Sequence, residues 1–131
     1  MMNALIVDDS SIDILLIRSI LEDGLPSNTS IIAFTESIVA KKHIDLHPIK
    51  ILVTDIEMPG IDGFELIEYT RKKHPEAIII AVSGSNFDDN ATNTILYAAK
   101  GVGANHVICK SNLFESLTNV INSVAESAIA G

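Results

Sequence analysis

The chain has 131 residues, 47% of them hydrophobic and 20% charged, which is typical of one globular domain that builds its core without disulfides or a structural metal. Nine basic residues against 17 acidic ones give a net charge of −8, which argues against direct binding of DNA or RNA through the phosphates. The longest uninterrupted apolar run, residues 77–82, is far shorter than the ~18 residues of a membrane-spanning helix, so we expect no membrane contact.

The N-terminal residues and the cysteine usage bear on the compartment. The apolar residues at the N-terminus end at Asp8 without a basic leader, which argues against a signal peptide. Cys109 is the only cysteine of the sequence, so it has no partner for an internal disulfide. We therefore expect a cytoplasmic protein.

Short apolar runs alternate with amphipathic stretches from the N-terminus onward. Residues 4–7 predict a first strand, and residues 10–24 predict a helix that begins at a serine cap and ends at Gly24. Its helical spacing predicts an inner stripe of Ile12, Leu15, Leu16 and Ile20. Residues 30–34 predict the second strand and residues 36–47 the second helix.

The same alternation continues through the second half of the chain. Residues 50–55 predict a third strand, and residues 64–74 a helix with Leu66, Ile67, Tyr69 and Thr70 around its inner face. The rest predicts, in order, a strand at 77–83, a polar loop at 85–93, a helix at 94–103, a strand at 106–110 and a helix at 112–127. The inner stripe expected for the last helix is Leu113, Phe114, Leu117, Val120, Ile121 and Val124.

Five strand–helix repeats with continuously apolar strands predict an α/β protein whose parallel strands are covered on both faces. The architecture is a (βα)5 doubly wound five-stranded parallel sheet with the flavodoxin-like order 2-1-3-4-5. We expect a single domain over residues 1–131, with a core at about 3–126, because no linker or repeat interrupts the pattern. In such sheets, ligands bind beyond the carboxyl ends of the strands.

Polar side chains gather at that edge of the predicted sheet. Asp8 and Asp9 follow the first strand, Asp55 ends the third, Ser83 ends the fourth and Lys110 ends the fifth. A single aspartate could cap the next helix, but capping does not explain five such groups together. Carboxylates at one place raise one another's pKa, and a bound Mg²⁺ would relieve the repulsion. With a cation, a hydroxyl donor and a metal, the pattern indicates phosphoryl transfer, in which a carboxylate is a suitable nucleophile.

Four segments carry a resemblance to a known family. IVDDS (6–10), TDIEMPGIDGFEL (54–66), VSGS (82–85) and GANHVICK (103–110) resemble the receiver domain of two-component response regulators. The resemblance implies that Asp55 accepts a phosphoryl group from a sensor histidine kinase or a phosphotransfer protein. It also implies that the protein is no enzyme beyond its own phosphorylation and dephosphorylation.

The resemblance also assigns roles around Asp55. Asp9 and Asp55 would bind Mg²⁺ directly, Asp8 would bind it through water, and the backbone carbonyl of Glu57 would be a further ligand. Ser83 and Lys110 would contact the phosphoryl oxygens, while Met58-Pro59 and Gly63 would shape the loop after the phosphoacceptor. No organic cofactor is implied.

The sequence departs from the family at two positions. Ser111 stands where a proline usually follows the lysine, so we expect a trans peptide bond after Lys110, because a cis bond without proline costs about 2.5–4 kcal/mol. Val107 replaces the usual aromatic residue, so the usual aromatic readout is absent and we expect residues 83–93 to order around the phosphoryl group instead. Glu57 and Ser85 either tune the phosphoryl lifetime or are simply exposed, and the sequence leaves this open.

Several alternatives stay open or are disfavoured. A degenerate receiver could act as a phosphorylation-independent docking module, and an aspartate-nucleophile phosphatase would place its nucleophile after the first strand. An FMN carrier is disfavoured because Asp8 and Asp9 would repel its phosphate. The spacing of His43 and His47 suits a helical metal pair, but no third ligand is evident. The downstream protein, a missing effector domain and a homodimer are left undecided.

Overall fold

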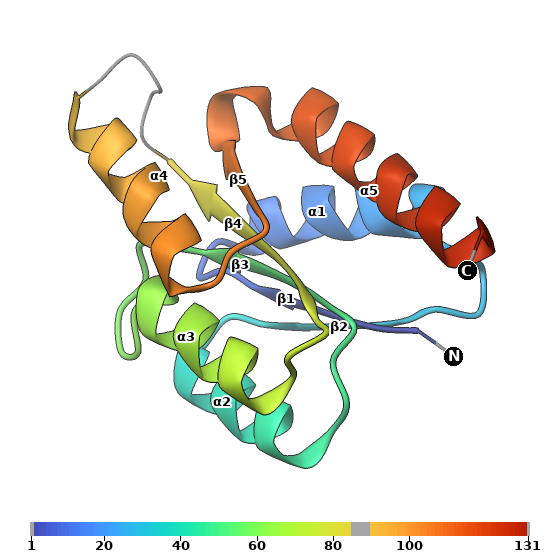
Figure 1. Cartoon of the computed structure of the whole chain (residues 1–131), viewed down its shortest axis with the longest axis horizontal. Helices are drawn as coiled ribbons and strands as arrows, with labels where there is room; N and C mark the ends of the chain where they lie inside the picture. The colour runs from blue at the N-terminus through green and yellow to red at the C-terminus, as the bar shows by residue number, and fades with distance from the viewer. Residues whose placement is uncertain (1, 85–89, 131) are drawn as a thin grey trace.

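The structure of the chain is a computed structural model that describes residues 2–84 and 90–130. Within these ranges the strands are β1 (Asn3–Val7), β2 (Ser30–Phe34), β3 (Ile51–Asp55), β4 (Ile78–Ser83) and β5 (His106–Cys109). The helices are α1 (Ser11–Gly24), α2 (Ser37–Leu46), α3 (Gly63–Lys73), α4 (Asn90–Val102) and α5 (Leu113–Ala130), and the short 3-10 helix η1 (Lys110–Asn112) lies between β5 and α5. Strands and helices alternate along the chain, as the sequence predicts (Figure 1).

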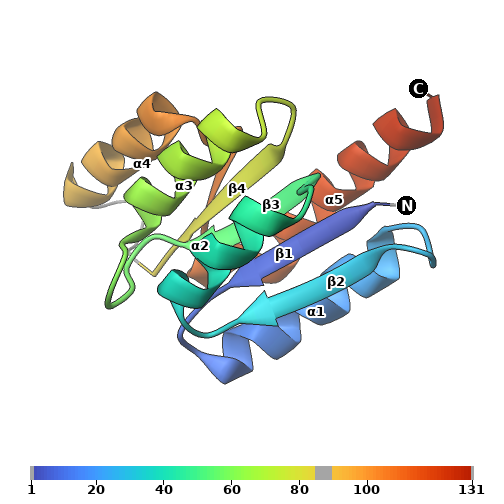
Figure 2. The same ribbon diagram turned by 90° about the horizontal axis from the view of Figure 1, so that it is seen from below.

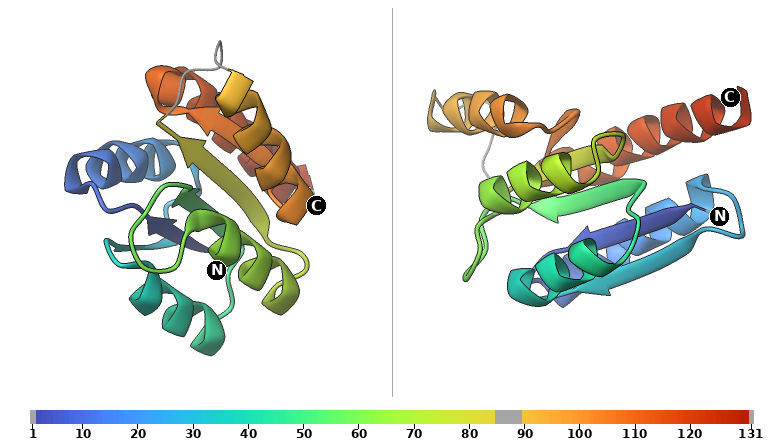
Figure 3. Two further views of the ribbon diagram at one scale, coloured as in Figure 1. Left: turned by 90° about the vertical axis from the view of Figure 1, so that its left-hand side faces the viewer. Right: turned by 60° about the horizontal axis from the view of Figure 1, so that its bottom comes forward.

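The strands form one parallel sheet in the order β2-β1-β3-β4-β5, which confirms the predicted flavodoxin-like order. The two neighbours of β1 lie in register with it through Leu5, which pairs with Ile32 of β2 and with Leu52 of β3. The helices cover both sides of this sheet (Figures 2 and 3). Because all strands are parallel, their carboxyl ends meet at one edge.

Two hydrophobic cores fill the space between the sheet and its helices. One joins β1, β3, β4 and β5 to α1 and α5, with Ile6, Val53 and Ile17 among its buried members. The other joins the opposite face of the strands to α2, α3 and α4, with Leu5 and Leu52 among its buried members. Neighbouring strand residues therefore belong to different cores, as the alternating direction of side chains along a strand requires. Burial on both sides explains why the strands are apolar throughout.

The inner stripe expected for the first helix is wrong in part. Ile12 and Leu15 have 79% and 67% of their surface exposed, and Leu16 is exposed as well. The buried residues of α1 are Ile17, Ile20 and Leu21. This helix carries two apolar stripes, and hydrophobicity alone does not tell which one faces the sheet. Phe114 of α5, also expected inside, is exposed too.

Three element boundaries differ from the expected ones. α4 begins at Asn90, inside the segment predicted as a polar loop. The low helix propensity of Asn and Thr favours a loop in the sequence, but tertiary context can override it. Lys110 belongs to η1 instead of the fifth strand, and α5 continues to Ala130. None of the helices in the described ranges is long and apolar enough to cross a membrane.

Candidate functional site

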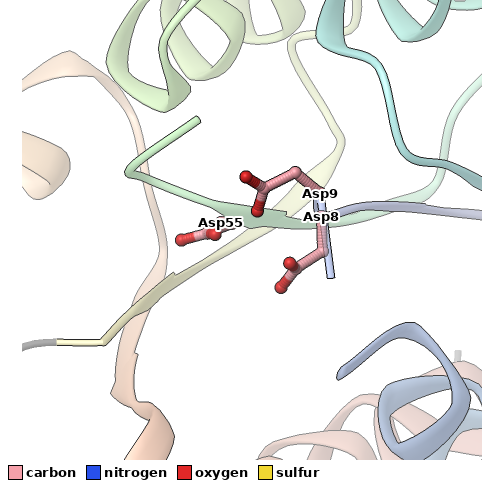
Figure 4. Close-up of side chains that lie close together, drawn as sticks. All are labelled: Asp8, Asp9 and Asp55. Carbon is pink, nitrogen blue, oxygen red and sulfur yellow. The ribbon is translucent and has the colours of Figure 1, made fainter. Parts of the chain in front are cut away.

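Three aspartates meet at the carboxyl edge of the sheet. Asp8 and Asp9 directly follow β1, and Asp55 is the last residue of the neighbouring strand β3. Their carboxylates lie close together (Figure 4), and one oxygen of each lies within 4.8 Å of the others. The sequence therefore correctly predicts that these three side chains come together.

Backbone amides hold the two buried carboxylates in place. Asp8 and Asp55 are buried, whereas Asp9 is exposed. Ser10 N donates to Asp8 Oδ1 at 2.8 Å, and Glu57 N donates to Asp55 Oδ1 at 3.2 Å. Asp8 Oδ2 accepts no hydrogen bond of normal geometry from the described residues, and an ion pair of 3.2 Å with Lys110 Nζ is its charged contact. The site thus contains a buried oxygen with unused acceptor capacity.

The electrostatics of the site disfavour two bare carboxylates. Burial raises the pKa of Asp8, and the Ser10 amide and the Lys110 ammonium offset only part of this rise. Burial also raises the pKa of Asp55, and the nearby charge of Asp8 raises it further. Within the site itself, one ammonium group therefore does not neutralise the acidic side chains.

Lys110 reaches the aspartates from the other end of the chain. Its Nζ lies 2.8 Å from Asp13 Oδ2, 3.2 Å from Asp8 Oδ2 and 3.4 Å from Asp55 Oδ2. Burial lowers the pKa of Lys110, but the hydrogen bond to Asp13 and the charges of the other two acids outweigh this and raise it. The peptide bond to Ser111 is trans, which confirms the expectation.

Asp13 is the residue of this cluster that the sequence analysis missed. An acid in the first turn of a helix is commonly explained by the helix dipole, so it carries no signal of its own. Its position three residues after the N-cap residue Ser10 does not by itself show that its carboxylate reaches Lys110.

Ser83 lies at the same edge and is buried. It is the last residue of β4 and pairs with Cys109 of β5. The residue before it, Val82, pairs with Asp55, and its carbonyl accepts a 3.0 Å hydrogen bond from Ile56 N. This register places Ser83 one residue beyond the level of Asp55 on the adjacent strand.

Other predicted residues lie around this centre or outside the described ranges. Glu57 is exposed, and Ser85 lies outside the described residues. Whether these two residues tune the phosphoryl lifetime stays a prediction. Residues 85–89, in the middle of the loop expected to order around a phosphoryl group, are also outside the described residues. Val107 packs half-buried against the core on the α2–α4 side, while His106 beside it is exposed.

The loop between β3 and α3 is fixed from α2. Ser37 Oγ donates to Pro59 O at 3.3 Å and accepts from Ile61 N at 3.0 Å. Between them, Gly60 has a φ of 86°, a conformation that favours glycine. Met58 packs against the core on the α2–α4 side. The loop is thus held from α2 through Ser37, in addition to the hydrogen bond from Glu57 N to Asp55 Oδ1 at its start.

His43 of α2 and His47, which directly follows the last residue of this helix, do not form a metal site with other described residues. The rings of His43 and His47 stack with centroids 4.3 Å apart, and His43 also contacts Phe34. No described group of three potential ligands contains either histidine. Their spacing is explained by ring stacking on the side of α2.

The aspartate group has the chemistry of a site for a hard divalent cation. Carboxylate oxygens are preferred ligands of such ions, and a cation would satisfy the unused capacity of Asp8 Oδ2. The exposure of Asp9 leaves a path from solvent. The arrangement therefore fits an acid-bound divalent cation beside an ammonium group.

Comparison with known families settles the relationship. The sequence pattern of the response regulator receiver domain matches residues 4–122. The chain belongs to this family. It is a receiver domain of the two-component signalling systems, and the phosphoryl-accepting role is the one that the family implies.

Curated relatives of this receiver domain are longer proteins. Over 86 residues it is 34% identical to the DNA-binding transcriptional activator EvgA of Escherichia coli K12, covering 65% of this chain and 41% of that protein. Over 82 residues it is 32% identical to a protein-glutamate methylesterase/protein-glutamine glutaminase of Paraburkholderia xenovorans, covering 60% of this chain and 22% of that protein. The chain thus spans less than half the length of these relatives.

Solved structures share the receiver fold. The isolated REC domain of RcsB from Salmonella enterica serovar Typhimurium, studied with phosphomimetic BeF3−, matches with a TM-score of 0.79 and 26% identity over 95% of this chain and 88% of that one. A signal receiver domain from Colwellia psychrerythraea matches with a TM-score of 0.81 and 22% identity, over 96% of this chain and 99% of that one. A Burkholderia pseudomallei response regulator with a phosphorylated aspartic acid and a calcium ion matches with a TM-score of 0.75 and 20% identity, over 99% of this chain and 72% of that one. The last two likenesses show the fold alone.

Proposed function

We propose that Asp55 is the phosphoacceptor of this receiver and takes a phosphoryl group from a phosphohistidine in a Mg²⁺-dependent reaction. A carboxylate oxygen of Asp55 forms the new P–O bond as the P–N bond to the donor histidine breaks. The acyl phosphate remains on Asp55, and the donor regains a neutral imidazole after protonation. The observation that carries the proposal is the position of Asp55, which is buried at the strand end, close to the carboxylates of Asp8 and Asp9 and 3.4 Å from Lys110 Nζ.

The three aspartates would hold the Mg²⁺, Asp9 and Asp55 directly and Asp8 through water, with the backbone carbonyl of Glu57 as a further ligand. The unused acceptor capacity of Asp8 Oδ2 and the raised pKa values of Asp8 and Asp55 support this assignment. When bound, Mg²⁺ supplies positive charge that offsets the repulsion between carboxylates and phosphate oxygens.

Lys110 and Ser83 have distinct tasks in the proposed reaction. The Lys110 ammonium, already 3.4 Å from Asp55 Oδ2, attracts the incoming phosphoryl oxygens and offsets the charge that they add. Ser83, buried on the adjacent strand, supplies a hydroxyl donor to a phosphoryl oxygen. Both groups bind and orient the phosphoryl group on Asp55. In this proposal no separate substrate is turned over, so the protein acts as a signalling switch and not as an enzyme in the usual sense.

The donor approaches over the side of the site formed by α1 and the start of α5. Leu16 and Phe114 line a surface depression together with Lys110, and both side chains are exposed. Exposed apolar residues beside a charged centre suit a partner that buries them on contact. We therefore propose a sensor histidine kinase or a phosphotransfer protein as the donor.

The rest of the signalling chain follows from the same proposal. Residues 1–131 form one receiver domain with its core at about 3–126, which either docks onto a downstream protein or passes the phosphoryl group onward. The greater length of the curated relatives supports an effector domain as a further possibility. Cys109 is buried and is the only cysteine of the sequence, which fits a reducing compartment such as the cytoplasm.

A second candidate is a docking module that never takes phosphate. Val107 in place of an aromatic residue and Ser111 in place of a proline favour it, since both depart from the switch residues of the family. The test is intact mass measurement after incubation with Mg²⁺ and acetyl phosphate, beside Asp55→Asn and a known receiver. A gain of one phosphoryl group that requires both Mg²⁺ and Asp55 supports the phosphoacceptor, and no gain in the folded wild type supports the docking module.

A further inference from the structure

The ammonium group of Lys110 is shared with a carboxylate that lies outside the three aspartates of the proposed metal site. Its shortest contact, 2.8 Å, is with Asp13 Oδ2 of α1, and the contact with Asp55 Oδ2 is longer at 3.4 Å. Both partners of the shorter pair are partly buried, with 23% of the Lys110 side chain and 28% of the Asp13 side chain exposed. Such a pair is less screened by solvent than one on an open surface.

Helix capping does not explain the direction of the Asp13 carboxylate. Ser10 caps α1 by accepting a 3.3 Å hydrogen bond from Asp13 N, so a reciprocal capping box would turn the Asp13 carboxylate back to Ser10 N. Ser10 N instead donates to Asp8 Oδ1 at 2.8 Å. The Asp13 carboxylate is thus directed to Lys110.

Lys110 Nζ donates hydrogen bonds to Asp13 Oδ2 and Asp55 Oδ2 and forms an ion pair with Asp8 Oδ2, so three carboxylates already share its charge. Any phosphoryl oxygen that reaches Lys110 must therefore share the group with these acids or displace one. Asp13 also adds a negative charge beside the phosphoacceptor, which opposes the arrival of another anion. Both effects act in the same direction.

We propose that Asp13 is a positioning residue that holds Lys110 toward α1 and thereby lowers the affinity of the site for a phosphoryl group. This inference rests on the proposed role of Asp55. In the unphosphorylated protein the ammonium is anchored on α1, and phosphorylation draws it toward Asp55. Asp13 therefore sets how much phosphodonor is needed to charge the receiver.

The test compares Asp13→Asn with Asp23→Asn at saturating Mg²⁺, with beryllofluoride as a stable mimic of the phosphoryl group and calorimetry as the measurement. Asp23 is an exposed acid of the same helix, about 15 Å further along it. We expect Asp13→Asn to lower the dissociation constant about fivefold, as for loss of one competing charge-assisted contact, and Asp23→Asn to change it less than about twofold. A merely structural role of Asp13 predicts an unchanged or weaker affinity, and that result would overturn the proposal.

A second arm separates the anchoring of Lys110 from a simple loss of charge. In a Lys110→Met background, Asp13→Asn has no ammonium to release, so its effect should fall below about twofold. A full effect in that background would overturn the proposal. Acetyl phosphate labelling of the wild type and of Asp23→Asn is measured in parallel. If neither is labelled, the proposed function itself fails, whereas labelled proteins with equal beryllofluoride affinity refute the role of Asp13 alone.

Discussion

Gly63 N donates a 2.9 Å hydrogen bond to Ile56 O, which holds the first turn of α3 directly against the backbone that follows Asp55. A Cβ atom at Gly63 would overlap with the carbonyl oxygen of Asp55 and with Cα of Ile56. Asp62 caps the same helix by accepting a 2.9 Å hydrogen bond from Glu65 N. The close approach of two backbone segments therefore explains why residue 63 of the 54–66 segment is a glycine.

Gly63→Ala should be strongly destabilising, because backbone atoms at the end of β3 cannot move aside without displacing Asp55. We expect the free energy of unfolding to fall by about 1–3 kcal/mol in denaturant titrations, in the range of overpacked buried sites. The matched control is Gly101→Ala in α4, where a Cβ meets no atom within 4 Å. That change should stabilise the helix by about 0.5–1 kcal/mol. Equal effects of the two substitutions would contradict the overlap.

Asp55→Asn should stabilise the metal-free protein. Because burial and the charge of Asp8 raise the pKa of Asp55, the folded state keeps this proton to a higher pH than the unfolded chain does. The stability that the protonated group contributes is therefore present below the unfolded pKa and lost as the pH rises through the folded pKa. At pH 7 in EDTA we expect the free energy of unfolding to rise by about 1 kcal/mol. Asp23→Asn is the control, and a loss of stability on Asp55→Asn would contradict the prediction.

The three acids and the lysine could be predicted because they stand at strand ends, where the parallel sheet brings distant residues together whatever the details of packing. Asp13 could not, because its role depends on which way a carboxylate in a helical first turn points. The predicted inner face of α1 is wrong in part for a related reason, although Ile20 is buried as expected. Ile12 and Ile17 are equally apolar in sequence, and only the placement of the helix on the sheet decides that Ile17 is buried. Side-chain direction and helix rotation are tertiary properties that periodicity does not contain.

Mg²⁺ should stabilise the wild type, and variants that lack a carboxylate of the proposed metal site should lose this gain. A ligand that binds only the folded state adds RT ln(1 + [L]/Kd), which is about 1.4 kcal/mol at ten times the Kd. Asp9→Asn should abolish most of this gain because it removes an exposed carboxylate of the proposed site while leaving the buried core intact. Thermal unfolding with and without Mg²⁺ measures the gain. Asp62→Asn, which keeps an acceptor at the α3 cap, is the control and should retain it.

Arg71 should contribute more to stability than its exposed neighbour Lys72. It donates to the carbonyl oxygens of Gly103, Pro75 and Ala77, and so joins the end of α3 to the turns before β4 and β5. Lys72 makes a single exposed ion pair of 3.7 Å with Glu68. We expect Arg71→Met to lower the free energy of unfolding by about 2–3 kcal/mol and Lys72→Met by less than about 0.5 kcal/mol. Similar losses would refute a special role for Arg71.

His43 should make the protein less stable as the pH falls below neutrality. Burial lowers the pKa of His43, and the charge of His47 beside it lowers the pKa further. The unfolded chain therefore takes up this proton first, so the stability associated with neutral His43 is present above about pH 6.5 and is lost as the pH falls through the folded pKa. In a plot of unfolding free energy against pH, His43→Gln should have a smaller slope than the wild type below pH 7. The curve of Lys42→Gln, a change at an exposed neighbour, should run parallel to that of the wild type. A His43→Gln curve that also runs parallel would show that the stacked pair is not linked to folding.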